Sequence, residues 1–422
     1  MSMIKCPECS SEVSDSALKC PSCGVQLRKA KRGFFGKLVK WGFIGFNIIM
    51  LIWLVGGMGA ATDGMEAMSE AETGTEVVAP TAPFIDDGKR KKIMTKKKPA
   101  AKLVIGENKS EVFCVRFSPD NLFVGAACGD GKIRIYNSNT GRPTYVLDTG
   151  SSLPATCIRF RPPGASAKTR NVLLATSSEG GVQHWHVTSG KCLHTSSEEG
   201  NQVYCVDYNT DASKFATAGK DYKIRLYDEA TKSHVSTLSG GFGDVTAGHA
   251  NRVFSLKFNP RDDNVLVTGG WDNTIQFWDV RVDHAIRSIF GPHVCGDAVD
   301  IHGSTVVSGS WRPDSQLQTW DFGTGKLMQD IPWVSAAASE PCLLYAARWS
   351  EDGEIIVAGG SGSNEAKIFD SYSGQSIGTI SGLTRAVYTV DVSSDNKMVA
   401  VAGGDASIRL LDLKEREKKP KE

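Results

Sequence analysis

The sequence predicts an all-β protein whose main part is a closed ring of seven small sheets, a β-propeller, preceded by a zinc ribbon and one transmembrane α-helix. Three observations lead to this prediction. From about residue 101 the chain repeats a pattern of short apolar strands and tight turns. Two Cys-x2-Cys pairs open the sequence, and an uncharged apolar run of membrane-spanning length follows them.

Composition agrees with a ring of sheets. The chain has 422 residues, of which 41% are hydrophobic and 44 are glycine, a mixture typical of many short strands joined by turns. Its formal net charge is +1. A dedicated nucleic-acid binder needs a basic excess to collect phosphates, so we expect no nucleic-acid partner.

The first 27 residues are predicted to be a zinc ribbon. Two "CPxC" turns hold its four ligands, which are Cys6, Cys9, Cys20 and Cys23. Each turn presents two thiolates on one side, and two turns supply the tetrahedral sulfur set that one structural zinc ion prefers. The alternative is two redox pairs, but these need a thioredoxin-like surround that so short a segment does not supply. The segment resembles bacterial zinc-ribbon modules.

Residues 41–62 are predicted to span a membrane as a helix, because they carry no charge and are long enough to cross a bilayer. A buried core helix is the alternative. The basic segment 28–40 lies before the span and acidic residues follow it, so the positive-inside rule places the zinc ribbon in the cytoplasm. Seven further cysteines scattered downstream favour a reducing compartment, so the side of the propeller is left open. We expect a disordered linker at 63–100 and a charged tail at 414–422.

The repeats occupy residues 101–413 and are marked by one anchor in the third strand of each unit. The anchors are Tyr136, Trp185, Tyr227, Trp278, Trp320, Phe369 and Leu411. They recur every 42 to 51 residues, which is the period of a four-stranded propeller blade. The motifs "FWD" and "TWD", with "LYD", "IFD" and "LLD", resemble the WD-repeat family. The seven anchors themselves predict seven blades. The resemblance implies that the strand at 101–106 completes the last blade and closes the ring.

One repeat holds His249, Thr268, Asp272 and Trp278, which include the residue types of a catalytic triad. The WD-repeat resemblance implies instead that these four form a hydrogen-bonded chain that fixes the blade. Other repeats keep only fragments of it. The unit at 334–380 keeps none of this polar set, and we expect it to be less rigid.

No motif for catalysis is visible. Neither a phosphate-binding loop nor an HExxH, GxSxG or paired-carboxylate pattern occurs, so we predict that the protein is not an enzyme and has no small-molecule substrate. His184 and His186 flank Trp185 on one strand face. Without an evident third ligand, we interpret them as two surface histidines.

Two sets of residues are candidates for binding a partner. The first set recurs four residues before the end of the first strand and comprises Phe113, Tyr204, Phe254, Tyr345 and Tyr388, with Thr156 and Asp297 in the other two blades. By the WD-repeat resemblance, this position edges the narrow mouth of the central channel, where aromatic rings anchor a peptide well. Strand alternation allows a core between blades as an equal alternative.

The second set lies in the turns. Trp271 and Trp311 occupy matching turns of adjacent blades, Arg312 follows directly, and Trp333 begins the next connecting loop. Turns are normally polar, so indoles beside an arginine suggest an interaction surface, although each Trp could instead cap its own turn.

The combined prediction is a membrane-tethered, non-catalytic scaffold that binds a protein or peptide partner on the top rim of the propeller. A receptor that reports a ligand to the zinc ribbon, and a propeller enzyme, are the alternatives.

Overall fold

The computed structural model describes residues 3–5, 12–14, 97–106, 108–163, 171–240, 248–334 and 340–415. The chain divides into two compact units, residues 1–80 and 81–422. In the first unit β1 (Met3–Lys5) pairs antiparallel with β2 (Glu12–Ser14). The four predicted zinc ligands, the basic segment, the predicted span at 41–62 and the tail from 416 onward lie outside the described residues. Within the described ranges there is no helix of the length and hydrophobicity that a bilayer crossing requires.

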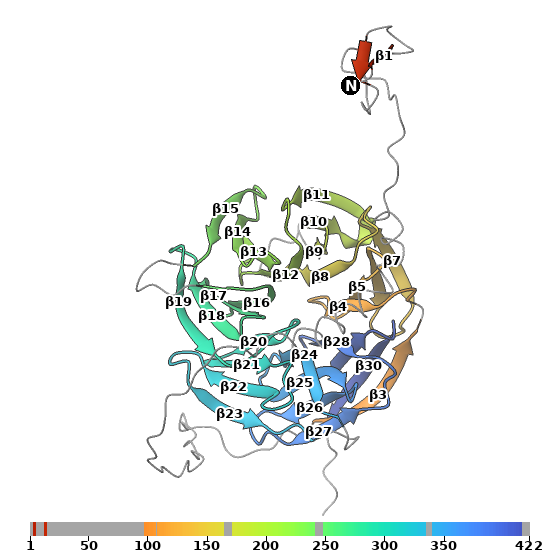
Figure 1. Ribbon diagram of the computed structural model, residues 1–422. Helices are drawn as coiled ribbons and strands as arrows, with labels where there is room; N and C mark the ends of the chain where they lie inside the picture. Colours follow the sequence, from red (N-terminus) through yellow and green to blue (C-terminus); the bar gives the residue numbers. More distant parts are fainter. Residues whose placement is uncertain are drawn as a thin grey trace, which may run out of the picture. The chain divides into compact units, whose positions relative to one another are not determined.

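The second unit is a ring of seven four-stranded antiparallel sheets, as the sequence predicts (Figure 1). Blade 1 contains β4 (Val112–Phe117), β5 (Phe123–Cys128), β6 (Lys132–Asn137) and β7 (Pro143–Asp148). Blade 2 contains β8 (Ala155–Phe160), β9 (Val172–Ser177), β10 (Gly181–His186) and β11 (Lys191–Ser197), with the short 3-10 helix η2 (Val187–Ser189). Blade 3 contains β12 (Val203–Tyr208), β13 (Lys214–Gly219), β14 (Ile224–Asp228) and β15 (His234–Leu238).

The remaining blades follow the same order. Blade 4 contains β16 (Val253–Asn259), β17 (Asp262–Gly270), β18 (Thr274–Asp279) and β19 (Ala285–Phe290). Blade 5 contains β20 (Val299–His302), β21 (Thr305–Gly309), β22 (Leu317–Asp321) and β23 (Leu327–Ile331). Blade 6 contains β24 (Cys342–Trp349), β25 (Ile355–Gly362), β26 (Ala366–Asp370) and β27 (Ser376–Ile380). Blade 7 contains β28 (Val387–Val392), β29 (Met398–Gly403), β30 (Ile408–Glu415) and β3 (Lys97–Ile105).

The first strand of every blade lies at the centre of the ring. These seven strands contact one another in an unbroken circle, from β4 through β8, β12, β16, β20, β24 and β28 back to β4. Each sheet therefore presents its inner strand to the central channel and its fourth strand to the outside (Figure 1).

The ring closes as predicted, because the N-terminal strand β3 pairs with β30 and completes blade 7. Figure 1 shows the orange β3 beside the blue β30. Leu103 stands opposite Leu410, and Ile105 opposite Ile408. The pairing is longer than the predicted 101–106, since Lys97 already stands opposite Glu415. Residues 97–100, which were predicted to be linker, are therefore strand, because backbone pairing does not need apolar side chains.

All seven predicted anchors lie in the third strand of their blades. All are buried, and Trp278 is fully enclosed. Each anchor fills the space between neighbouring sheets, where burial of a large side chain stabilises the fold by about 1.5–3 kcal/mol.

A β-bulge interrupts the first strand of six blades. In blade 4, for example, Val253 pairs with Gly270 and Ser255 with Gly269, so Phe254 has no partner on the second strand. The unpaired bulge residues are Phe113, Thr156, Tyr204, Phe254, Tyr345 and Tyr388. A bulge shifts the alternation of the pleat and re-aims the side chain. This explains why Phe254 is half-buried while Leu256 and Phe258 are core residues.

Candidate functional site

The four residues that resemble a triad form the predicted hydrogen-bonded chain. Nδ1 of His249 lies 2.8 Å from Oδ2 of Asp272, and Nε2 lies 2.6 Å from Oγ1 of Thr268. The indole N–H of Trp278 donates to the same hydroxyl at 2.7 Å. Thr268 and Trp278 are fully buried. A nucleophilic hydroxyl has to meet its substrate, so this one holds strands together and performs no chemistry.

The carboxylate at the end of this chain is held charged. Burial alone would raise the pKa of Asp272, but its bond with His249, the hydroxyl of Thr274 and the backbone N–H of Ala250 outweigh burial and lower the pKa. A carboxylate that accepts several hydrogen bonds is cheap to keep ionised in a half-buried position.

In two other blades, different residues form a hydrogen bond between the segment before the first strand and the third-strand anchor. In blade 3 the buried carboxylate of Glu198 accepts bonds from Thr217 and, at 2.9 Å, from the hydroxyl of Tyr227. In blade 1 the hydroxyl of Tyr136 donates to Asn108 Oδ1 at 2.6 Å. The sequence pattern missed Glu198 and Asn108 because it required a histidine, although both precede the first strand as His249 does.

Blade 6 lacks the histidine-based set, as predicted, but it has a polar substitute. The indole N–H of Trp333 donates to Oε1 of the buried Glu365 at 2.7 Å, and the Trp333 ring lies 5.4 Å from Phe369. Lys367 lies 3.9 Å from the same carboxylate. Trp333, predicted as a partner contact, is thus half-buried and bonded within its own blade.

The interpretation of His184 as a surface residue is wrong. His184 is buried and its Nε2 lies 2.9 Å from Glu229 of blade 3, whereas His186 is half-buried and bonds to Ser189. Burial lowers the pKa of His184. The pair of residues therefore serves two separate contacts and does not form a joint metal site.

The predicted rim aromatics come together on one face in two arcs. In the first arc the rings of Phe113 and Tyr388 stack with centroids 5.6 Å apart. Tyr388 also meets Tyr345 edge-on at 5.6 Å, and Tyr345 lies 6.4 Å from Trp311. The indole N–H of Trp311 donates to Ser361 at 3.3 Å.

The second arc starts in blade 3. Tyr204 and Phe254 stack at 4.7 Å, and Phe254 lies 5.2 Å from Trp271. Trp271 in turn stacks on His293 at 6.2 Å, and the guanidinium of Arg252 lies 4.9 Å from its ring centre. Trp271 and Phe254 hold each other in place, so this Trp is part of a larger surface and not only a cap on its own turn.

The two arcs join between blades 4 and 5, because the backbone N–H of Trp311 donates to the carbonyl of His293 at 2.8 Å. We name the joined surface the aromatic crescent. Its members are Phe113, Tyr388, Tyr345, Trp311, His293, Trp271, Phe254 and Tyr204, all half-buried. The opening of the crescent is at blade 2, where the bulge residue is Thr156.

Arg312 follows Trp311 on this rim and is exposed. It donates to the carbonyl of Gly291 at 2.6 Å. Burial, with the nearby Arg312 charge, lowers the pKa of His293.

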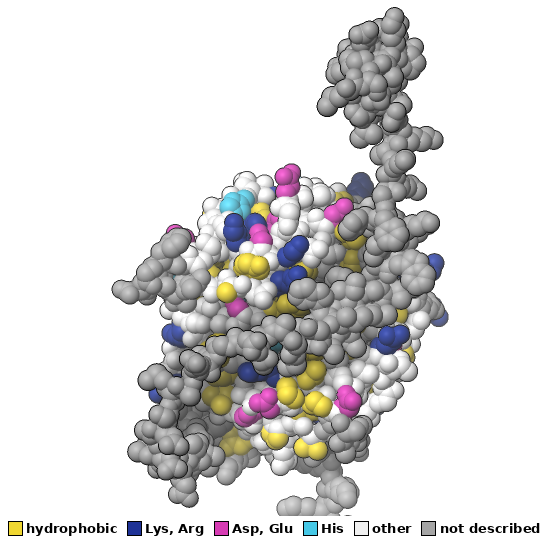
Figure 2. Space-filling model, in the orientation of Figure 1, with side chains coloured by type: hydrophobic (Ala, Val, Ile, Leu, Met, Phe, Trp, Pro, Cys, Tyr) yellow, Lys and Arg dark blue, Asp and Glu magenta, His cyan; other side chains and the backbone are white. Residues whose placement is uncertain are grey.

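On the face seen in Figure 2, hydrophobic side chains form small patches among basic and acidic ones.

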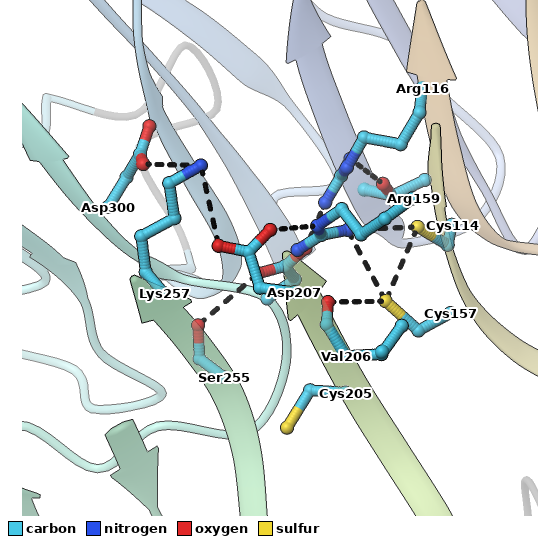
Figure 3. Close-up of polar contacts among 12 residues, drawn as sticks. Cys114, Arg116, Cys157, Arg159, Cys205, Val206, Asp207, Ser255, Lys257 and Asp300 are labelled. Atoms are coloured by element: carbon cyan, nitrogen blue, oxygen red, sulfur yellow. Dashed lines mark hydrogen bonds and ion pairs between the residues drawn. The ribbon is translucent and has the colours of Figure 1, made fainter. Parts of the chain in front are cut away.

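A ring of charged side chains has one member in each blade, three residues after the bulge residue in six blades and three residues after Asp297 in blade 5. We name it the charge ring; it consists of Arg116, Arg159, Asp207, Lys257, Asp300, Arg348 and Asp391. Neighbours in the ring pair across blade boundaries, as Arg159 does with Asp207 at 3.2 Å and Lys257 with Asp300 at 3.6 Å (Figure 3). The sequence reasoning missed this ring, although the superposition of repeats that gave the aromatic set would have shown it three residues later.

The acidic members also bond to the next blade's backbone. Oδ2 of Asp207 accepts from the N–H of Phe258 at 3.1 Å, and Asp300 accepts from Trp349 at 3.0 Å. Asp391 accepts from Phe117 at 2.8 Å, across the closure between blades 7 and 1. Each carboxylate therefore ties two blades together, and Asp207 and Asp300 do so as buried groups.

Because the charge ring has seven members, positive and negative charges cannot alternate all the way round it. Two positive charges are neighbours between blades 1 and 2, where Arg116 and Arg159 are adjacent. Asp297 of blade 5 compensates for them. Its Oδ2 pairs with Arg116, with Arg159 at 2.7 Å and with Arg348 at 2.8 Å. Burial would raise the pKa of Asp297, but the three guanidinium groups hold it well below its usual range. The predicted rim position of blade 5 is thus occupied by a carboxylate that crosses the channel.

Comparison with known proteins agrees with this architecture. The model of the WD domain, G-beta repeat, matches residues 100–137, 190–228, 241–279 and 374–412. These four matches and the seven-bladed ring support the WD-repeat family for the propeller.

The chain is similar to the guanine nucleotide-binding protein subunit beta of Oryza sativa subsp. japonica, with 21% identity over 325 residues, 71% of this chain and 80% of that protein. It is 25% identical over 215 residues to cell division cycle 20.1, cofactor of APC complex, of Arabidopsis thaliana, covering 49% of this chain and 44% of that protein. The WD repeat-containing protein slp1 of Schizosaccharomyces pombe is 23% identical over 272 residues, 63% and 51% of the two chains. The first two names describe a subunit and a cofactor, in agreement with the prediction that the chain is not an enzyme.

Proposed function

We propose that the protein is a non-catalytic propeller scaffold that binds a protein or peptide partner on the aromatic crescent. The observation that carries the proposal is the continuity of the crescent, in which eight half-buried rings follow the rim through six of the seven blades. Rings held by one another lose little entropy when a partner covers them. The relatives named as a subunit and as a cofactor also favour protein partners.

The tether and the metal are further parts of the proposal. Residues 41–62 would anchor the scaffold in a membrane by one span, with the zinc ribbon in the cytoplasm and one zinc ion on Cys6, Cys9, Cys20 and Cys23. Their support is the sequence pattern alone. Membrane fractionation of the full chain, with protease protection of residues 101–413, tests the anchor and the side of the propeller. A chain that stays soluble without detergent would contradict the anchor.

The binding surface is tested with the double variant Trp271→Ala and Trp311→Ala. These residues sit in the middle of the crescent, where loss of the rings removes contact area from both arcs. We expect proteins captured by the wild-type chain, and identified by mass spectrometry, to be absent from the variant's capture.

Tyr372→Ala is the matched control. Tyr372 is an exposed aromatic residue in the turn after the third strand of blade 6, at the opposite end of the strands from the crescent. The control should retain every captured partner. Partners that bind the double variant as well as the wild type would contradict the proposed surface.

A further inference from the structure

Two buried cysteines lie at the one boundary where the charge ring has like charges side by side. Cys114 of β4 and Cys157 of β8 are each 2% exposed, and their Sγ atoms are 3.9 Å apart. Each cysteine directly follows the bulge residue of its strand, which is Phe113 in β4 and Thr156 in β8. The two thiols therefore occupy matching positions in adjacent blades. Figure 3 shows them facing each other, with Cys205 of blade 3 turned elsewhere.

The surroundings favour a thiolate in this pair. Nη1 of Arg159 lies 3.3 Å from Sγ of Cys157 and 3.8 Å from Sγ of Cys114, and Arg116 is close by. Burial would raise the pKa of Cys114, but its hydrogen bond with Cys157 and the charges of Arg116 and Arg159 lower it to about 6. The bond with Cys114 and burial raise the pKa of Cys157, so Cys114 is the thiol of the pair that ionises first.

The other buried cysteines provide a contrast within the same molecule. Burial raises the pKa of Cys128 to about 11 and that of Cys342 to about 11. Cys205 occupies the matching position in blade 3, and burial raises its pKa too. A thiol in an apolar surround stays protonated and inert, whereas a thiolate beside guanidinium groups is nucleophilic.

We propose that Cys114 and Cys157 form a peroxide-sensitive dithiol that oxidises to a disulfide between blades 1 and 2. The sulfurs have to approach by about 1.9 Å to reach the length of an S–S bond, on strands that already contact each other. The site takes hydrogen peroxide as its oxidant, a molecule little larger than water.

The chemistry balances in two steps. The thiolate of Cys114 attacks one oxygen of the peroxide, the O–O bond breaks, and the departing hydroxide takes a proton to leave as water, giving a sulfenic acid. The sulfur of Cys157 then attacks the Cys114 sulfur, its thiol proton joins the departing hydroxyl, and a second water leaves as the S–S bond forms. Two thiols lose two electrons, and one peroxide becomes two waters.

The test treats the folded full chain with hydrogen peroxide, quenches it, and alkylates the remaining thiols in denaturant before tryptic digestion. We expect a peptide of residues 110–116 linked to one of residues 135–159 in the mass spectrum, lost after reduction with dithiothreitol. Because the link is identified by its peptides, the N-terminal cysteines do not confuse the result. Recovery of both peptides alkylated and unlinked, while the exposed Cys192 is oxidised, would overturn the proposal.

Three variants complete the experiment. Cys114→Ser and Cys157→Ser should each abolish the link, whereas Cys205→Ser is the matched control and should keep it. Ser255 stands at this position in blade 4, so the fold accommodates the substitution. If either variant fails to fold, the wild type still decides: a small thiol reagent at pH 7 should modify Cys114 at least tenfold faster than Cys128. Equal rates would contradict the thiolate.

Discussion

At the scale of single residues, the hydroxyl of Thr268 is the centre of the chain that links His249 to Trp278. Replacing it with the isosteric valine leaves two buried nitrogen groups without a partner. We expect Thr268→Val to lower the free energy of unfolding by about 3 kcal/mol, measured by urea denaturation. Thr144→Val is the control, because Thr144 is an exposed strand residue, and it should change the free energy by less than about 0.5 kcal/mol. Equal effects of the two variants would show that the chain of bonds does not stabilise blade 4.

Asp297 makes the stability of the ring depend on pH. Burial opposes ionisation, but the guanidinium groups of Arg159, Arg348 and Arg116 keep the pKa of this carboxyl well below that of the unfolded chain, about 3.9. Its contribution is therefore complete above about pH 5 and is lost as the pH falls through 4 toward the folded pKa.

The variant Asp297→Asn removes this charge at every pH. We expect it to be less stable than the wild type at pH 7, by an amount that shrinks steadily as the pH falls below about 4. Urea titrations at a series of pH values measure the difference. A gap that stays constant down to pH 3 would contradict the role of the ionised carboxyl.

At the scale of elements, the closure by β3 couples the two ends of the propeller. Deleting residues 101–106 removes the part of β3 that pairs with residues 408–411, so the amides of this part of β30 should exchange with solvent at least tenfold faster in hydrogen-exchange mass spectrometry. Deletion of residues 63–68, the same length of chain ahead of the strand, is the control and should leave β30 protected. Unchanged protection after the first deletion would refute the closure.

The elements also show how far sequence reasoning extends. The third strands could be located because a large buried anchor recurs in each blade. The position of the Phe254 side chain on the rim could not be predicted, since strand alternation fits a core position equally well. Only the bulge between Val253 and Ser255 turns this side chain to the rim. Bulges depend on local backbone pairing, and no residue pattern in a single chain marks them here.

At the scale of the whole molecule, the site combines a rim that could be predicted and a centre that was missed. The rim residues stood out as aromatic rings that recur at one position of the first strands, together with two tryptophans in matching turns. The charge ring did not, because each member is an ordinary charge in its own repeat, and its meaning lies in pairing across blades, as between Arg159 and Asp207. Asp297 joins blade 5 to blades 1 and 2 across the channel. Its contact with Arg159 links residues that are 138 positions apart in the sequence.

The central claim is that partners bind the propeller through the aromatic crescent. It is tested most directly by calorimetric titration of a captured partner, after purification, against the wild type, the Trp271→Ala and Trp311→Ala double variant, and Tyr372→Ala. Loss of hot-spot rings costs roughly 2 kcal/mol or more, so the double variant should bind at least about 30-fold more weakly while the control binds as the wild type does. A dissociation constant that is the same for all three chains would contradict the account.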